Sequence, residues 1–567
     1  MPRPTWHGST HFIDGIGDEG IRMHDVRVPV LIVGGGPVGL STALFSQRHG
    51  VGTMLVEKRD GTSTLPRAPG LQARTLEMFR SAGLGPDIRA LEIGDSHPDF
   101  EGGIIQAETF AQVAEAVTVE RPSLDGPSIS PERVMGCGQD RYERVLAEKA
   151  GALGADIRFG TKLVELRQDP DGVTAVAEEQ HSGRRITVRA DYVVAADGTN
   201  STVRALLGVP RHGRGTVFDA LSIYFHSNDL EMLLKDHRFI LFYASASGTL
   251  TGLSRLHGCS PWLAAPLYHP HQGEKPEDFT DERCAQIIRT AAGRADLDVE
   301  IVAKIPWEGA QLVAERFRVD RVFLAGDAAH VHPPAGGFGA NTGIHDAHNL
   351  SWKLAAVLQG RGGAALLDTY HEERHAVGSA MAAQALVRNR IRHGYATDED
   401  KRSMVDDIIV TLGYRYSSSS VSAPADRPVL TPELRLEGEP GTRAPHVWLE
   451  RDGERISTID LFWDDHVLLT DSSPAARHWA QAARSVADEL GLSLRTHVLG
   501  PDGELVPQDR DWAQAFGVHE GGAVLVRPDA MVAWRSPHPA GDLAQALARI
   551  RTSLARAAGH APAPAGR

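Results

Sequence analysis

The residues best suited to chemistry in this chain are three glycines near its start. Residues 28–33 form an apolar run too short for a helix, and glycines follow at positions 34, 36 and 39. Gly34 allows the chain to turn, Gly36 lets a pyrophosphate approach the backbone, and Gly39 lets the next helix lie close to the strand. The phosphates would then face the helix N-terminus, where unpaired N–H groups and the helix dipole favour negative charge.

A carboxylate follows at the distance expected for binding a ribose. The second apolar run, residues 53–56, ends in Glu57, eighteen residues after Gly39. A carboxylate there accepts hydrogen bonds from the diol of an adenosine that lacks a 2′-phosphate. The glycine pattern alone is a weak signal, and a glycine-rich turn of an ordinary α/β domain is the alternative. With a strand before it, a helix after it and the acid in place, the sequence predicts a dinucleotide-binding unit.

Two later turns repeat this arrangement of an apolar strand followed by glycine and aspartate. Asp197-Gly198 follows the apolar run 192–196, and Gly326-Asp327 follows the run 321–325. The second of these turns continues into a glycine-rich stretch, residues 334–341. A carboxylate would suit a sugar-like hydroxyl, and the N–H groups of the glycines would suit a phosphate or a polar ring.

Two histidine motifs raise the question of a metal. Residues 371–375 read HEERH and satisfy the HExxH pattern of zinc peptidases, with Glu399 as a possible third ligand. Exposed residues of an ordinary helix are the alternative for His371 and His375, since a short pattern can match by chance. His330 and His332 form HxH without an evident third ligand, so we expect a structural or cofactor-side hydrogen bond and no metal.

The pattern of apolar runs predicts an α/β protein whose parts position these groups. Parallel-sheet patterns over 27–214 and 308–400 are interrupted by alternating runs over 215–307, which indicate an inserted antiparallel sheet. The poorly readable segment 87–129 is a candidate addition to that inserted sheet. A connecting helix and linker are predicted over 401–447, where residues 417–420 are four serines. A small α/β domain over 448–557 resembles a thioredoxin-like fold.

Composition narrows the class of partner and the compartment. The 567 residues include 59 basic and 73 acidic side chains, for a net charge of −14, which argues against nucleic acid or an anionic membrane as partner. Cys137, Cys259 and Cys284 are odd in number and widely spaced, so neither a disulfide framework nor a cysteine metal site is indicated, and the last domain cannot perform thiol–disulfide chemistry. Without an apolar block in the first 26 residues or a membrane-length segment, we expect a cytoplasmic protein.

The three turns in this order resemble the single-component FAD-dependent aromatic hydroxylases. The resemblance covers residues 27–400 and includes the glycine-rich continuation from Pro334 to Asn341 and the later Trp352-Lys353-Leu354. The chain length, the last domain and Arg443-Ala444-Pro445-His446 are similar to the branch containing phenol hydroxylases and the polyketide hydroxylases of tetracenomycin- and anthracycline-type pathways.

The resemblance implies an NADPH-consuming monooxygenase that hydroxylates a phenolic or polycyclic aromatic substrate through a flavin C4a-hydroperoxide formed with O2. NADPH would bind transiently, because the chain has no second GxGxxG, and the protein would be a monomer or homodimer. No acid–base pair stands out. The implied cofactor-binding residues are Gly34, Gly36, Pro37, Gly39, Glu57, Lys58, Arg67, Gln139, Asp197, Gly198, Gly326, Asp327, Pro334, Gly337, Gly339, Ala340 and Asn341.

The inserted sheet should cover the substrate. The pocket candidates are the aromatic residues of this sheet, one of its histidines, and the proline that begins the glycine-rich stretch 334–341. They are Tyr224, His226, Phe239, Phe242, Tyr243, Trp307 and Pro334. Packing in a core is the alternative role for most of them, since aromatics are favoured in sheets anyway. Baeyer–Villiger insertion or oxidative rearrangement on the same fold stays open. A zinc peptidase, a halogenase and a non-catalytic interaction protein are more distant readings.

Overall fold

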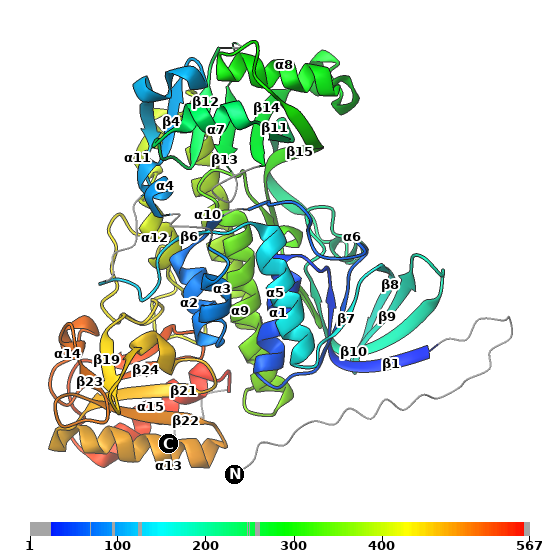
Figure 1. Ribbon diagram of the computed structural model, residues 1–567. Coiled ribbons are helices and arrows are strands. Elements are labelled where there is room, and N and C mark those ends of the chain that lie inside the picture. The colour runs from blue at the N-terminus through cyan, green and yellow to red at the C-terminus, as the bar shows by residue number, and fades with distance from the viewer. Residues whose placement is uncertain are drawn as a thin grey trace, which may run out of the picture.

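The computed structural model consists of a central α/β body, a second sheet above it and a smaller α/β body at the lower left of Figure 1. It describes residues 24–68, 70–92, 97–122, 128–246, 248, 250–255 and 261–560. Cys259 and residues 1–23 lie outside these residues, and residues 24–26 belong to the first strand.

The central sheet brings the three predicted turns together. Its strands are β16 (Arg318–Val319), β17 (Val322–Leu324), β10 (Arg185–Ala195), β1 (His24–Val33), β2 (Thr53–Val56) and β7 (Asp156–Arg158), in that spatial order, with β8 (Thr161–Asp169) and β9 (Gly172–Glu179) attached to β10. β1, β10 and β17 are parallel, and Val33 pairs with Ala195, which pairs with Leu324. Because their carboxyl ends coincide, the turns that follow them meet at one edge.

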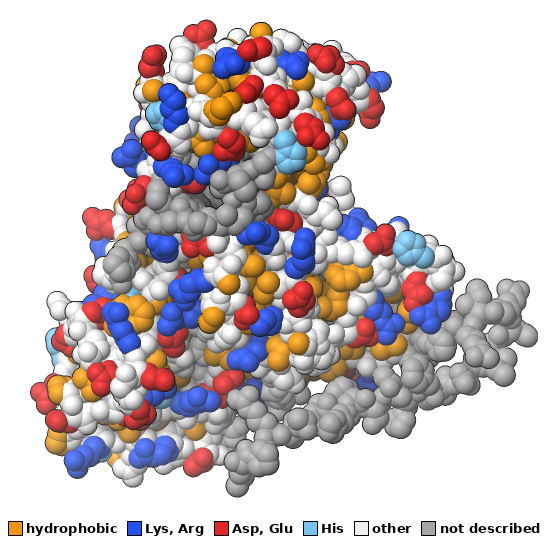
Figure 2. Space-filling model, viewed as in Figure 1, with side chains coloured by type: hydrophobic (Ala, Val, Ile, Leu, Met, Phe, Trp, Pro, Cys, Tyr) orange, Lys and Arg blue, Asp and Glu red, His pale blue; other side chains and the backbone are white. Residues whose placement is uncertain are grey.

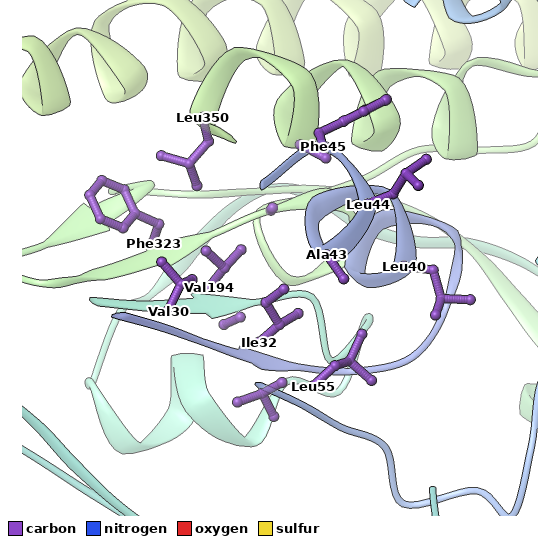
Figure 3. Packing of buried hydrophobic residues seen from close by; sticks show 14 of the residues in the cluster. Val30, Ile32, Leu40, Ala43, Leu44, Phe45, Leu55, Val194, Phe323 and Leu350 are labelled. Carbon is purple, nitrogen blue, oxygen red and sulfur yellow. The ribbon is translucent and has the colours of Figure 1, made fainter. Parts of the chain in front are cut away.

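Long helices cover this sheet. They are α1 (Pro37–Arg48), α2 (Ala73–Ser81), α5 (Gln139–Ala152), α9 (Phe338–Leu358) and α10 (Asp368–Arg392), with short helices α3 (Gly85–Arg89), α4 (His97–Gly102) and α6 (Thr202–Leu206). Figure 3 shows Phe45 of α1 and Leu350 of α9 beside Val30 and Phe323 of the sheet, all in one core. α9 is buried along most of its 21 residues, so its position is set by packing on every side.

The second sheet is the predicted insertion. Its order is β18 (His330–Val331), β15 (Glu300–Ala314), β11 (Arg211–His226), β14 (Trp262–Tyr268), β13 (Thr251–Arg255), β12 (Leu241–Ala244), β4 (Ile104–Ala107) and β5 (Val117–Glu120). All its pairs are antiparallel except β12 with β4. The segment 87–129 therefore contributes strands, and β11 and β15 extend beyond the predicted boundaries at 215 and 307. Helices α7 (Asn228–Leu234) and α8 (Asp281–Ala292) complete it.

The last part of the chain holds two small sheets. One has the order β20 (Glu454–Ser457), β19 (Trp448–Arg451) and β23 (Val506–Pro507), and the other β22 (Leu494–Leu499), β21 (His466–Asp471), β24 (Ala523–Val526) and β25 (Val532–Ser536). Helices α13 (Arg477–Leu490) and α15 (Leu543–Ala557) share one hydrophobic core against the second of these sheets, and α14 (Trp512–Ala515) is short. The parallel pair β21–β22 followed by antiparallel β24 and β25 fits the thioredoxin-like prediction, which stays a prediction.

The segment predicted as a linker is buried at both ends, residues 413–421 and 441–447, and mostly exposed or half-exposed between them. After α11 (Asp398–Ser403) and α12 (Asp407–Leu412), the chain runs without regular structure to β19. Tyr416, Ser420 and Arg443 in this segment are at most 3% exposed. A serine-rich composition indicates flexibility only when the hydroxyls are solvated, and here the hydroxyls of Ser418 and Ser420 donate to a buried carboxylate, that of Glu373.

Candidate functional site

The first glycine turn has the shape of a phosphate cradle. Gly34 has φ +108°, and a Cβ there would lie 2.2 Å from the Ala196 carbonyl oxygen. A Cβ on Gly39 would lie 1.8 Å from the Gly34 carbonyl oxygen, so helix and strand can approach only without a side chain. At Gly36 the nearest such atom is 4.0 Å away, which leaves its backbone open at the N-terminus of α1, where Pro37 is the first residue.

Glu57 is fixed beside this cradle. One of its carboxylate oxygens accepts from the Gly35 N–H at 2.5 Å, and the other accepts from the backbone N–H and the Nε of Arg59. Although burial opposes ionisation, these donors hold the pKa of Glu57 below its ordinary value. The carboxylate is therefore charged and oriented, as a ribose acceptor must be. Lys58 next to it is exposed.

Arg67 and Gln139 are brought together by a main-chain bond, in which the Gln139 N–H donates to the Arg67 carbonyl at 2.9 Å. The Gln139 side chain donates to Glu143, whose other oxygen accepts from the Ser63 N–H at 2.6 Å. Glu143 is fully buried and its carboxylate is the closest group to Gly36. Sequence reasoning missed Glu143, which holds the loop at the mouth of the cradle.

The Asp197-Gly198 turn is mainly a structural cap. The Asp197 carboxylate accepts from the hydroxyl of Ser201 and from the N–H of Val203, at the start of α6. The next residue but one, Thr199, donates to Asp327 at 3.2 Å. The second predicted turn thus orients the third one, and it is Asp327 that remains accessible in the cleft.

The Gly326-Asp327 turn is held by a buried carboxylate on α9. Asp346 accepts from the Gly326 N–H at 3.0 Å and from His330 Nε2 at 2.6 Å, and its second oxygen accepts from Arg374 Nε at 2.7 Å. His330 and Asp346 form this contact without solvent exposure. His332 lines the cleft, and its ring stacks on His330 with centroids 4.9 Å apart. The HxH motif is therefore part of the support for the turn.

The N-terminus of α9 faces the same cleft, where the Gly337 N–H already donates to the Pro334 carbonyl at 3.0 Å. Gly336 and Gly337 have φ +85° and +65°, which a side chain would disfavour, and the first turn of the helix carries no acidic residue. Gly337, Gly339, Ala340 and Pro334 line the cleft. The side chain of Asn341 is already used: it accepts from the Gln72 N–H and donates to the carbonyls of Gly70 and Gly337.

A cavity of about 990 Å³ lies between this edge and the second sheet. This volume is at the upper end of the ~300–1,000 Å³ usual for small-molecule sites. The part of its wall that belongs to the sheet consists mostly of small or apolar residues, from alternate positions of β11, β12, β13 and β14: Ala220, Ser222, Tyr224, Leu241, Tyr243, Gly252, Ser254, Leu263, Ala265 and Leu267. A flat, largely apolar surface results.

The alternation of side chains along the strands decides which predicted pocket residues reach the cavity. Of the candidates, Tyr224, Phe239, Tyr243, Trp307 and Pro334 line it. Phe242 does not, because on β12 it points to the opposite face, where it packs edge-on against Phe110. His226 does not, because it lies exposed at the end of β11. Both of these predictions were wrong.

The polar groups of the cavity were missed by sequence reasoning. Arg392, near the end of α10, makes a double ion pair with Glu120 of β5 at 2.6 and 2.9 Å and hydrogen-bonds Tyr243. Arg67 hydrogen-bonds Tyr224 on the side of the cavity that faces the glycine turns. Burial raises the pKa of both tyrosines although the arginines oppose it, so both are neutral at pH 7. Glu120 and Arg392 are 272 positions apart, and no short motif links them.

The HExxH motif has no metal-binding geometry. His371 and His375 are half-buried rather than exposed, and they pack around Phe317, whose N–H donates to His371 Nδ1. Glu372 accepts from the N–H of Ser419, and Glu399 is exposed on α11. Within the described part of the chain, no three His, Cys, Asp or Glu side chains are placed to hold a metal ion.

Comparison with known proteins identifies the family. Residues 27–385 match the family described as FAD binding domain, and residues 437–559 match the one described as aromatic-ring hydroxylase, C-terminal. The chain belongs to the FAD-dependent aromatic-ring hydroxylases. The predicted family, the α/β fold with an inserted sheet, the cofactor FAD and the monooxygenase class are thereby confirmed.

Individual hydroxylases align over nearly the whole chain. The tetracenomycin A2 monooxygenase-dioxygenase of Streptomyces glaucescens is 44% identical over 95% of this chain and 98% of that protein. The aklavinone 12-hydroxylase RdmE of Streptomyces purpurascens is 38% identical over 93% of this chain and 98% of that protein. A crystal structure of aklavinone-11 hydroxylase with FAD and aklavinone superposes with a TM-score of 0.82 at 36% identity, over 94% of this chain and 100% of that one.

Charge on the visible surface is mixed, and the helices are not of the membrane-spanning kind in the described residues. Acidic and basic side chains are interspersed over the face seen in Figure 2. Among the helices of the described residues, none is long and apolar enough to cross a membrane.

Proposed function

We propose that this hydroxylase uses NADPH to hydroxylate a planar, polycyclic phenol or hydroxyquinone. The observation that carries the proposal is the cavity of about 990 Å³, which opens on one side to the three turns and on the other to the flat face of the sheet. The flavin would occupy the part of this cavity beside Asp327 and residues 334–340, and the substrate the part along the sheet, where a close fit is needed to exclude water from the reaction. Relatives named for tetracenomycin A2 and aklavinone support the same class.

The residues present fit FAD. Gly34, Gly36 and Gly39 would let the pyrophosphate approach the N-terminus of α1, and Glu57 would accept from the adenosine ribose. Asp327 would accept from the ribityl chain. The N–H groups of Gly339 and Ala340 would lie along the pyrimidine edge of the flavin, at the positive end of α9. Gly337, whose N–H donates to the Pro334 carbonyl, would let the backbone approach the flavin.

Further cofactor contacts follow from the neighbours of these groups. Arg67 and Gln139, joined through their backbones, would lie along the pyrophosphate and ribityl chain, and Lys58 would face solvent near the adenosine. Asn341 would contribute through its backbone, since its side chain is occupied. Asp197 and Gly198 would act through the Thr199–Asp327 hydrogen bond rather than by touching the cofactor.

Bound FAD, once reduced by NADPH, activates molecular oxygen and supplies the oxygen atom that is transferred. The chain must then hold the aromatic ring at a fixed distance and keep water out. Ala220, Gly252 and Ala265 leave room for a flat ring system, and Trp307 bounds it. A substrate phenol activates its own ring, so the protein needs no strong base.

The cluster of Glu120, Arg392 and Tyr243 would set the orientation of the substrate. Glu120 neutralises Arg392, and the remaining donors of the guanidinium and the tyrosine hydroxyl can bind a carbonyl or hydroxyl oxygen. Such donors favour a molecule with an oxygen substituent far from the ring that reacts. Simple phenol lacks that oxygen.

The test compares substrates on the purified holoenzyme. We expect yellow flavin bands, anaerobic bleaching by NADPH, and faster NADPH oxidation with three- or four-ring hydroxyquinones than with phenol. Product mass should rise by one oxygen atom, and NMR should place it as a ring hydroxyl. Rates with phenol that match those with polycycles would refute the substrate class, and a ring-inserted oxygen would show Baeyer–Villiger chemistry instead.

Two variants isolate the role of the flat wall. Ala265→Phe fills the cavity above the sheet, and we expect a higher KM for the polycyclic substrate and a smaller change for phenol. The control is Val302→Phe, because Val302 is 48% exposed outside the cavity lining on the same sheet. Equal effects of the two variants on the polycyclic substrate would contradict the proposed position.

A further inference from the structure

The tip of the β24–β25 hairpin is buried, although hairpin tips usually lie in solvent. Residues 527–531 connect the two strands, and Arg527, Asp529 and Met531 are at most 2% exposed. Burying two charges is costly unless each is paired and hydrogen-bonded. The tip must therefore fit a prepared partner, and that partner is the FAD-binding body.

The charged part of the tip joins α9 to α10. Arg527 makes two hydrogen bonds to Glu373 of α10, at 2.5 and 2.9 Å. The same carboxylate accepts from Asn349 and Lys353 of α9, each at 2.7 Å. Asn349 also donates to Asp529 at 3.3 Å. The two helices are thus held to one another through a carboxylate that the hairpin neutralises.

The apolar part of the tip supports the start of α9. Met531 belongs to a buried cluster with Phe338, Met381 and Tyr414. Phe338 is the first residue of α9 and directly follows Gly337, one of the glycines at the cleft. A displacement of Met531 would therefore be felt at the N–H groups that face the cofactor.

The same helix also controls the opposite side of the cleft. Asp346 of α9 holds the Gly326-Asp327 turn and is paired in turn with Arg374 of α10. Arg374 donates to the Tyr416 hydroxyl, which also accepts from Asn349. Buried hydrogen bonds therefore run from the hairpin tip to the Gly326-Asp327 turn, and the apolar cluster joins the tip to the N-terminus of α9.

We propose that the hairpin tip of the C-terminal domain, residues 527–531, is a positioning element for FAD. It fixes α9 against α10, so that the N-terminus of α9 and the Asp327 turn face the same flavin ring. The domain contributes no group to the reaction. This inference rests on the proposed placement of FAD at these two surfaces.

The experiment measures FAD binding by the full-length apoprotein and two variants. Met531→Ala removes side-chain atoms from the buried cluster that contains Phe338, and Arg527→Met removes the charge opposite Glu373. We expect the FAD dissociation constant to rise roughly tenfold or more in each, because small misplacements of a site have effects of this size. The visible spectrum of the flavin that remains bound should shift. Arg527→Lys, which keeps the charge, should recover part of the affinity.

The control is Arg551→Met, which breaks a half-exposed ion pair with Glu489 in the same domain. It should leave the dissociation constant and the spectrum unchanged. Far-UV circular dichroism gives the folded fraction, and if Arg527→Met does not fold, Met531→Ala decides. Folded variants with wild-type affinity and spectrum would overturn the inference. A wild-type protein that binds no FAD would instead overturn the proposed function.

Discussion

The two adjacent glutamates of the HEERH segment provide a sharp test, because the sequence motif and the structure assign importance to different ones. In the zinc pattern Glu372 is the essential residue, whereas in the structure it is exposed and Glu373 is fully buried. Although burial alone would raise it, Arg527 and Lys353 hold the pKa of Glu373 well below its ordinary value. We therefore compare Glu373→Gln with Glu372→Gln.

The expected difference follows from the contacts. Glu373→Gln keeps the shape but removes the negative charge shared by Arg527 and Lys353, leaving Asp529 as the remaining carboxylate of this buried cluster. Removing one partner of a buried pair costs about 3–5 kcal/mol, a large part of a typical stability of ~5–15 kcal/mol. Glu372→Gln weakens only contacts of the carboxylate with Ser419, worth about 1 kcal/mol or less.

Urea unfolding followed by tryptophan fluorescence measures this difference. With a slope near ~3 kcal/mol per M, the first transition of Glu373→Gln should move down by about 1 M or more, and that of Glu372→Gln by much less. The reasoning is refuted if the two variants unfold at the same urea concentration. If Glu372→Gln lost more stability than Glu373→Gln and the wild type bound zinc, the hypothesis of a metal site in the HEERH segment would be restored.

Three further predictions concern the cofactor site and pH. Asp327→Ala should weaken FAD binding by about 1.5–3 kcal/mol, measured by flavin fluorescence, because a ribityl hydroxyl loses a charged acceptor; unchanged affinity would show that the residue is misplaced. Gly39→Ala should lower the thermal midpoint and FAD content, since its Cβ would lie 1.8 Å from the carbonyl oxygen of Gly34, while Gly61→Ala, with no atom within 4 Å, should not. Burial and nearby arginines lower the pKa of His49 to about 3. The unfolded chain then binds a proton that the folded one does not, so stability should fall as pH drops from about 6.5 toward 3. His49→Phe should make this fall in the urea midpoint smaller without abolishing it, because burial also lowers the pKa of His446 and His466 to about 4.

The dinucleotide cradle could be predicted from sequence because its requirements are local. A separate steric requirement selects glycine at each of positions 34, 36 and 39, and Glu57 follows at the end of the next strand. The two later turns could be joined to the first because parallel strands end at one edge of a sheet, as the pairing of Val33, Ala195 and Leu324 shows. To expect the three turns at one edge, it was enough to recognise that each follows a strand of the parallel sheet.

The wall of the cavity was predictable only in part. The run around Tyr243 was recognised as a strand, but both Phe242 and Tyr243 were assigned to the pocket, and alternation permits only one of them. Choosing between them requires knowing which face of the sheet meets the flavin-binding body.

The segment predicted as a linker makes contacts that bear on the C-terminal domain. Ser418 and Ser420 fit a flexible linker by composition, yet their hydroxyls donate to Glu373, a residue of the HEERH segment some 45 positions earlier. Arg527 completes the same site from more than 100 positions later. Three stretches that look unrelated in sequence thus form one buried cluster of charges and hydroxyls. The polar groups of each stretch find their partners in the other two. This cluster holds α9, and α9 presents N–H groups to the cleft. We therefore expect removal of the C-terminal domain to cause loss of FAD, although it removes no group that takes part in the reaction.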